Sequence, residues 1–270
     1  MCQTLGVSRS GFYAWQHRPE SARARTDRRL RYVLRIAHRE SHQRYGSPRL
    51  QRELRDRGHW VGRNRVMRLM RLDDLRGRAP RRWRTTTISD PAAVAAPNLL
   101  QQRFAVARLN EVWAGDITAI ATQEGWLYLA VLLDLYSRAI VGWALRPTLE
   151  TELVLAAWHR ALGRRQRSPR VHHSDRGVQY TSAAYQAVLR HHGVTVSMSR
   201  RGNCYDNAPV ESFFRTLKTE LTDRPSWPTR QAAAHAIGEY IDRFYNTQRL
   251  HSSLDYQSPQ RFETRLAAAV

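Results

Sequence analysis

Three acidic residues at a distinctive spacing offer the clearest chemistry in this chain. Asp116 stands within residues 111–120, where apolar residues alternate with small or polar ones, and this alternation predicts a strand. Asp175 ends a second predicted strand, residues 170–175, and Glu211 falls near the start of a predicted helix. The two aspartates are separated by 58 residues, and Asp175 and Glu211 by 35. Carboxylates are the hard oxygen ligands that divalent cations such as Mg²⁺ prefer.

The predicted helix that carries Glu211 has clear start signals. Asn207 is a favoured N-cap residue, and Pro209 is tolerated only in a first helical turn. Arg215 and Lys218 follow Glu211 at spacings of four and three residues, so the three share one helix face. A carboxylate beside two cations suits a metal ion bound next to a phosphate diester. A surface stripe of ion pairs is the alternative interpretation of this spacing.

The charge of the chain indicates a polyanionic partner. A net charge of +21 on 270 residues repels itself unless a polyanion neutralises it. Residues 1–90 hold 23 arginines and 8 acidic residues, so we expect nucleic acid to bind the first third of the chain. A GC-rich genome would explain arginine in place of lysine, but not the excess of arginine over acidic residues.

Lys218 stands out because it is the single lysine beside 43 arginines. An ammonium group is a compact, flexible point charge that reaches a phosphate where a planar guanidinium would not fit. We therefore expect Lys218 to contact a DNA phosphate near the metal ions, with chance sequence drift as the alternative.

The composition is that of a globular protein, and the scarcity of cysteine favours a reducing cytoplasm. A hydrophobic content of 42% is compatible with a real core. No run approaches the roughly eighteen apolar residues of a membrane helix, and the N-terminus does not have the pattern of a signal peptide. Two cysteines, Cys2 and Cys204, exclude a disulfide framework, and no Cys/His spacing typical of zinc sites occurs.

The first residues, 1–20, predict part of a helix-turn-helix. Residues 2–15 have the pattern of its turn and second helix, with Ser8 as the N-cap. Because the first helix of the motif is missing, we expect this reading frame to be the downstream half of a longer product. A small disordered or packing segment is the alternative.

Residues 21–75 predict a compact, helix-turn-helix-like module of three helices. The third helix starts near residue 62 and is the candidate for the major groove, with Arg63, Arg65 and Arg68 facing outward. A solvated charged face is the alternative. Residues 76–107 predict a basic linker. Its arginines are expected to track a DNA backbone, and those that we assign to DNA binding are Arg81, Arg82 and Arg84.

Residues 108–225 predict a mixed α/β domain. Three strands in an antiparallel meander are followed by helix, strand, helix, strand and helix. Residues 226–270 predict a helical extension with one long core helix at 229–247. The Arg249 and His251 that follow it are weaker candidates for DNA contact or a supporting role.

Polar residues near the three acids are expected to support them. His173, Gln179 and Asn207 are the candidates, and no partner spacing makes His173 part of a zinc site. Two further acidic residues, Asp134 and Asp206, are better explained by turn and capping chemistry.

Four stretches in order resemble the integrase-core transposases and retroviral integrases, and especially the OrfB proteins of insertion-sequence family three. They are residues 112–118, 173–180, 202–221 and 245–254, with Ser258 and Pro259 after the last. The resemblance covers nearly the whole chain. It implies an α/β fold with an RNase H-like integrase core, preceded by an N-terminal all-α helix-turn-helix-like module.

The resemblance also implies an activity, a cofactor and partners. Asp116, Asp175 and Glu211 would form an Asp-Asp-Glu (DDE) set that binds two Mg²⁺ ions, which Mn²⁺ can replace, with Asp116 bridging both. The protein would cut double-stranded DNA at the element ends and join the freed 3′-hydroxyl to target DNA. It would assemble as a homo-oligomer on DNA, with the upstream-frame OrfA protein as a partner or fusion. The alternatives are a non-catalytic DNA-binding regulator and a nuclease of the same fold without joining activity.

Overall fold

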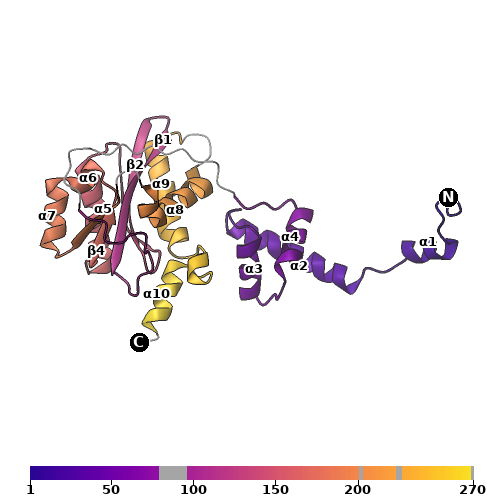
Figure 1. Ribbon diagram of the computed structural model, residues 1–270. Helices are drawn as coiled ribbons and strands as arrows, with labels where there is room; N and C mark the ends of the chain where they lie inside the picture. The colour runs from indigo at the N-terminus through magenta and orange to yellow at the C-terminus, as the bar shows by residue number, and fades with distance from the viewer. Residues whose placement is uncertain (79–95, 201–202, 223–226, 269–270) are drawn as a thin grey trace. The chain divides into compact units, whose positions relative to one another are not determined.

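The computed structural model describes residues 1–78, 96–200, 203–222 and 227–268 (Figure 1). The chain divides into two compact units, Met1–Arg78 and Ala79–Val270, and each is described by itself. Within these ranges no helix is long and apolar enough to cross a membrane.

The first unit is entirely helical, as predicted. Its helices are α1 (Arg9–Gln16), α2 (Ala22–Glu40), α3 (Ser47–Asp56) and α4 (Arg63–Leu72). The Ser8 hydroxyl accepts a hydrogen bond from the Gly11 N–H, which confirms Ser8 as the N-cap of α1. Helices α2, α3 and α4 pack through leucines that are fully buried, such as Leu34 in α2 and Leu50 in α3. Their apolar residues recur at helical spacing, and this periodicity produces one shared core.

The second unit is built on a five-stranded mixed sheet. Its strands are β1 (Val112–Thr122), β2 (Gly125–Asp134), β3 (Ile140–Arg146), β4 (Val171–Ser174) and β5 (Thr195–Met198). The strand order is β3-β2-β1-β4-β5, with β1, β2 and β3 antiparallel and β4 and β5 parallel to β1. This is the predicted meander followed by two parallel strands, so the predicted fold class is confirmed.

Helices cover both faces of the sheet (Figure 1). Their bounds are α5 (Thr151–Arg165), α6 (Val178–Thr181), α7 (Ala183–His191), η1 (Cys204–Asn207), α8 (Ala208–Leu217), η2 (Lys218–Thr222), α9 (Arg230–Glu239), η3 (Tyr240–Tyr245), η4 (Ser252–Leu254) and α10 (Pro259–Ala267). Helices α5, α6 and α7 lie on one side, and α8 and α9 lie on the other. Strand β2, which lies next to the central strand β1, is therefore buried on both faces and is a nearly continuous apolar run.

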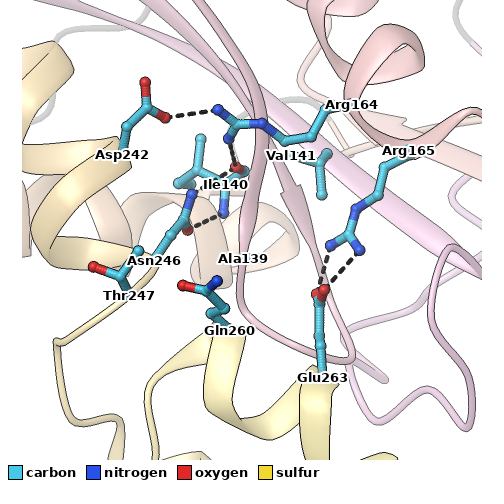
Figure 2. A pocket seen from close by; sticks show the side chains of 10 residues that line it. All are labelled: Ala139, Ile140, Val141, Arg164, Arg165, Asp242, Asn246, Thr247, Gln260 and Glu263. Carbon is cyan, nitrogen blue, oxygen red and sulfur yellow. Dashed lines mark hydrogen bonds and ion pairs between the residues drawn. The ribbon is translucent and has the colours of Figure 1, made fainter. Parts of the chain in front are cut away.

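The predicted long helix at 229–247 differs from the observed one in its last turns. It is α-helical through Glu239 and then widens into the π-helix η3. The apolar side chains of this segment are buried, as predicted, including Ile237 and Tyr240. The segment after η3 is fastened to the edge strand β3, where the Asn246 side-chain amide donates to Ile140 O at 3.0 Å and accepts from Ile140 N at 2.9 Å (Figure 2).

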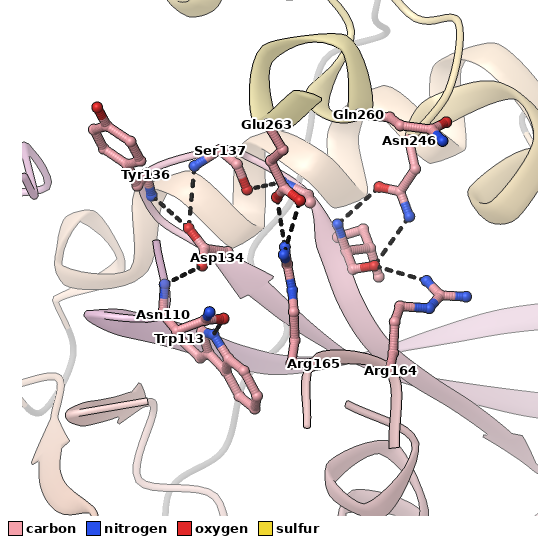
Figure 3. A network of polar contacts seen from close by, with 12 residues as sticks. Asn110, Trp113, Asp134, Tyr136, Ser137, Arg164, Arg165, Asn246, Gln260 and Glu263 are labelled. Carbon is pink, nitrogen blue, oxygen red and sulfur yellow. Dashed lines mark hydrogen bonds and ion pairs between the residues drawn. The ribbon is translucent and has the colours of Figure 1, made fainter. Parts of the chain in front are cut away.

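The turn between β2 and β3 is organised by the buried Asp134. Its carboxylate accepts hydrogen bonds from the backbone N–H groups of Asn110, Tyr136 and Ser137 (Figure 3). This confirms the turn role predicted for Asp134. A cavity of about 320 Å³ opens beside this edge of the sheet, between β3, α5, η3 and α10 (Figure 2). Asp116, Asp175 and Glu211 are not among its lining residues.

Gly142 provides a direct test of the packing between β3 and α5. A Cβ atom at this position would lie 2.2 Å from Ala157 O and 2.7 Å from Ala161 Cβ. Because both neighbours belong to a buried helix, Gly142→Ala should lower the free energy of unfolding by about 3 kcal/mol in urea titrations. Gly163→Ala is the matched control, since nothing lies within 4 Å of its added methyl group. Equal stability of the two variants would contradict this packing.

Candidate active site

Asp116 and Asp175 are brought together by adjacent parallel strands. The register of β1 and β4 pairs Ala114 with His173, and its continuation by two residues sets Asp116 level with Asp175. Each carboxylate is oriented by a nearby backbone N–H: Ile117 N donates to Asp116 Oδ1 at 2.7 Å, and Gly177 N donates to Asp175 Oδ1 at 2.9 Å. The two acids therefore stand side by side where β1 and β4 run together.

Glu211 lies in the first turn of α8, and its charge acts on Asp116. Burial raises the pKa of Asp116 well above its usual range, and the charges of Asp175 and Glu211 raise it further. Burial also raises the pKa of Asp175 and that of Glu211, where Arg215 acts in the opposite direction. Three half-buried carboxylates that act on one another disfavour each other's ionisation, and a neighbouring positive charge would relieve this.

Two observations indicate that these residues suit a divalent cation. One is the mutual repulsion of oxygen ligands just described, which a cation would relieve. The other is the buried Asn207 Oδ1, which has no hydrogen-bond partner among the described residues. As the side chains stand, however, no three His, Cys, Asp or Glu side chains in the described part of the chain could hold one ion together. The acids are within electrostatic range but do not form a closed ligand set.

Asn207 departs from the predicted N-cap role. It does occupy the N-cap position of α8, but its side chain makes no capping hydrogen bond. Its Nδ2 instead donates to Gly115 O at 3.2 Å, so the amide ties the start of α8 to the strand residue before Asp116. The side chain is buried between these two elements. This contact places the helix that carries Glu211 against β1.

Asp206 was predicted to act in turn and capping chemistry, and this prediction was wrong. Its fully buried carboxylate pairs with Arg200, whose Nη2 and Nε each donate at 2.9 Å, and it also accepts from Gln102 Nε2 at 3.0 Å. The Arg200 hydrogen bond holds the pKa of Asp206 well below its usual range. Sequence spacing missed Arg200, because a single arginine six residues away has no distinctive local signal.

His173 and Gln179 are both buried close to the strand ends. The His173 ring hydrogen-bonds Ser197 Oγ at 2.8 Å and Asp206 O at 2.9 Å, and burial lowers its pKa, so the ring is neutral. Gln179 Nε2 donates to Leu149 O at 3.0 Å. Both side chains therefore connect elements around the acids, which is compatible with the supporting role predicted for them.

The charge of Lys218 lowers the pKa of the Asp116 carboxyl. The helix α8 ends at Leu217, so Lys218 is the first residue of the π-helical turn η2. Arg215 is exposed in the last turn of α8. Arg215 acts on Glu211 from the same α-helix, whereas Lys218 lies in a π-helical turn, so the face predicted for all three stays a prediction.

The arginines predicted to read DNA divide into three groups. Arg63 is exposed at the start of α4. Arg65 and Arg68 are already ion-paired with Asp27 of α2, the former at 2.8 Å, so the outward orientation predicted for them is only partly right. The linker arginines lie outside the described residues: Arg81, Arg82 and Arg84.

Comparison with known proteins gives consistent results for both parts of the chain. Two family models described as integrase core domain match residues 107–204 and 192–259, and one described as HTH-like domain matches residues 25–83. The chain is 47% identical over 268 residues to the insertion element IS600 uncharacterized 31 kDa protein of Shigella sonnei, covering 98% of each. It is 42% identical over 269 residues to the transposase InsF for insertion sequence IS3A of Escherichia coli (strain K12), covering 98% of this chain and 93% of the relative.

Similar solved structures include a simian T-cell lymphotropic virus intasome in complex with PP2A regulatory subunit B56 gamma. That match has a TM-score of 0.48 and 16% identity, and it covers 85% of this chain and 73% of the other. The HTLV-2 integrase catalytic core domain in complex with magnesium has a TM-score of 0.43 and 18% identity, over 57% of this chain and 95% of the other. The sequence relatives, which match almost end to end, decide the family. This chain belongs to the IS3-family InsF-type transposases, and it is a DNA transposase of an insertion sequence with an integrase core.

Proposed function

We propose that Asp116, Asp175 and Glu211 are the catalytic DDE set of this transposase, which cuts DNA at the element ends and joins the freed 3′-hydroxyl to target DNA. The observation that carries the proposal is the pKa of Asp116, raised by burial and then by the charges of Asp175 and Glu211. Like charges held close together lower the stability of the fold, and such an arrangement is expected where a cation binds.

Two Mg²⁺ ions, which Mn²⁺ can replace, are the proposed cofactors. Asp116 would contact both, and Asp175 and Glu211 would hold one each. When bound, the ions activate the attacking oxygen and stabilise the leaving oxygen. Because the three side chains do not yet form a closed set, we expect the Glu211 side chain to turn toward the aspartates on metal binding. Its position in the first turn of α8, half-buried, leaves the flexible side chain room to do so.

The cations on the following turns are proposed to hold the DNA. Lys218, whose charge acts on Asp116, would bind the phosphate next to the one that is attacked, and the exposed Arg215 would bind the flanking backbone. Asn207 would keep the start of α8 against β1 while Glu211 engages the metal. In this arrangement water attacks first, and the released 3′-hydroxyl attacks a second phosphate.

The helical first unit is proposed to bind the element ends. The HTH-like domain match and the exposed Arg63 at the start of α4 support α4 as the helix that enters the major groove. We further propose assembly of at least two copies on paired DNA ends, and association with the upstream-frame OrfA protein, either as a partner or as a fusion.

Removal of any one acid tests the catalytic set. Asp116→Asn, Asp175→Asn and Glu211→Gln should each slow cleavage and joining at least about a hundredfold, because a metal-binding oxygen is lost, while DNA affinity is retained. The assay supplies uncut element ends, and separately pre-cut 3′-ends with target DNA. Glu152→Gln, an exposed acid at the start of α5, is the control. Retained catalysis in a variant removes that residue from the set, and hydrolysis without joining in the wild type indicates a nuclease.

The raised pKa of Asp116 predicts a pH dependence of stability. Without metal, the folded protein keeps a proton that the unfolded chain has released, so stability is present at low pH and falls as pH rises above about 4. Urea unfolding in EDTA at about pH 5 and about pH 8 should show a smaller difference for Asp116→Asn than for the wild type. Added Mg²⁺ should stabilise the wild type more at the higher pH, because it binds the ionised acids. An identical pH dependence in the variant would contradict the crowding.

Salt dependence tests the DNA-binding surface of the first unit. Arg63→Gln should weaken binding to element ends and reduce the slope of log K against log salt by about 0.9, since one phosphate contact or its equivalent is lost. Arg65→Gln is the comparison, because Arg65 already pairs with Asp27 and its loss should mainly lower the stability of the helical unit. A slope unchanged by Arg63→Gln would place the contact elsewhere.

A further inference from the structure

A buried ion pair outside the three acids involves Arg249 and Glu220. Arg249 Nη2 donates to Glu220 Oε1 at 2.8 Å, and Arg249 Nε lies 3.1 Å from both carboxylate oxygens. Tyr240 Oη donates to Glu220 Oε2 at 2.7 Å. The two charged side chains are only 6% and 5% exposed, so this geometry is shielded from water. Such a pair is held in one arrangement, because either charge alone would be left buried and unpaired.

The pair joins the C-terminal segment to the helix that carries Glu211. Glu220 belongs to η2, the π-helical continuation of α8, and Arg249 follows η3. A second contact reinforces the junction, since the ring of Tyr245 meets that of Phe213 in α8 edge to face, with 4.8 Å between centroids. Residues 245–254, one of the four stretches that resemble the family, therefore pack against α8 and its continuation η2.

The junction lies next to Lys218. Lys218 is the first residue of η2, two residues before Glu220, and η2 continues the helix α8 that carries Glu211. Among residues 218–221 Glu220 alone is buried. Its anchoring therefore fixes the wide π-helical turn, and with it the backbone from which the Lys218 side chain extends. π-Helical turns are rare and occur frequently at functional sites.

We propose that Arg249 and Glu220 are positioning residues for strand cleavage and joining, and that their ion pair holds η2 so that Lys218 meets the DNA phosphate beside Asp116. The pair touches neither the DNA nor the reacting atoms. The inference rests on the proposed function, because it requires that Lys218 contact DNA at the site. A displacement of about 1 Å in such a contact can cost a hundredfold in rate.

The test is a double-mutant cycle in the full chain. Glu220→Gln with Arg249→Met removes both charges together, so no single charge is left buried. This pair variant, Lys218→Met and their combination are compared in single-turnover cleavage of a bound element end. We expect the pair variant and Lys218→Met each to slow cleavage by about ten- to a hundredfold, and the combination to be no slower than Lys218→Met alone. The pair variant should lose no more DNA affinity than Lys218→Met, which removes one phosphate contact.

A matched control is available in the same unit. Arg165 and Glu263 form another Arg–Glu pair, with Arg165 Nη1 donating to Glu263 Oε2 at 2.8 Å, and this pair joins α5 to α10 (Figure 3). Arg165→Met with Glu263→Gln should leave the cleavage rate unchanged. The change in the free energy of unfolding of this variant shows how much stability is lost with a pair that is not connected to η2.

The outcomes separate the two proposals. Losses that multiply when the pair variant is combined with Lys218→Met overturn the positioning role and leave the role of Lys218 intact. Cleavage at the wild-type rate by Lys218→Met overturns the role of Lys218 and the positioning inference with it. Should the pair variant fail to fold, Tyr240→Phe replaces it, since it removes only the hydroxyl that donates to Glu220. A loss not additive with Lys218→Met then supports the inference, and wild-type cleavage overturns it.

Discussion

In the proposed function, the mutual repulsion of three half-buried carboxylates is the constraint on which the rest of this transposase depends. Adjacent parallel strands place Asp116 beside Asp175, and α8 adds Glu211, at a position where burial already disfavours ionisation. A fold selected for stability alone would not place three acids there. The sheet that carries the two aspartates is well packed, with β2 buried on both faces and α5 close against β3.

The helix α8 and its continuation η2 are held by contacts at both ends. In the proposed function, these contacts keep the backbone in place while the Glu211 side chain turns toward the aspartates. At its start, Asn207 binds Gly115 O of β1, and the preceding residue Asp206 is locked to Arg200. At its end, Glu220 is locked to Arg249. The side chains of Glu211 and Lys218 can then adjust to metal and DNA while the backbone that carries them stays in place.

Local sequence patterns were sufficient to predict most helices and strands and to propose the three acids. Alternation around Asp116 predicted β1, helical periodicity predicted α2 to α4, and Ser8 was correctly assigned as an N-cap. The spacing of Asp116, Asp175 and Glu211 predicted a metal-binding set, and this stays a prediction, although the charges of Asp175 and Glu211 raise the pKa of Asp116. These features depend on residues close together in sequence, or on a spacing shared with a known family.

Contacts between distant segments could not be predicted in this way. Asn207 is a residue type favoured at N-caps. Its side-chain amide instead donates to a strand carbonyl, a contact that the local sequence cannot reveal. Asp206 accepts from Gln102, 104 residues away, and the Glu220–Arg249 pair joins residues 29 apart. The π-helical turn that begins at Lys218 has no recognised sequence signal and contains Glu220, whose partner Arg249 is distant in sequence.

The most direct test of the central claim is to locate Mn²⁺ by anomalous scattering in crystals of the protein bound to an element end. The account predicts two ions, with oxygens of Asp116, Asp175 and Glu211 at about 2.1 Å, the distance typical of a small divalent cation. Ions bound elsewhere, or acids that remain apart in the presence of metal and DNA, would contradict it.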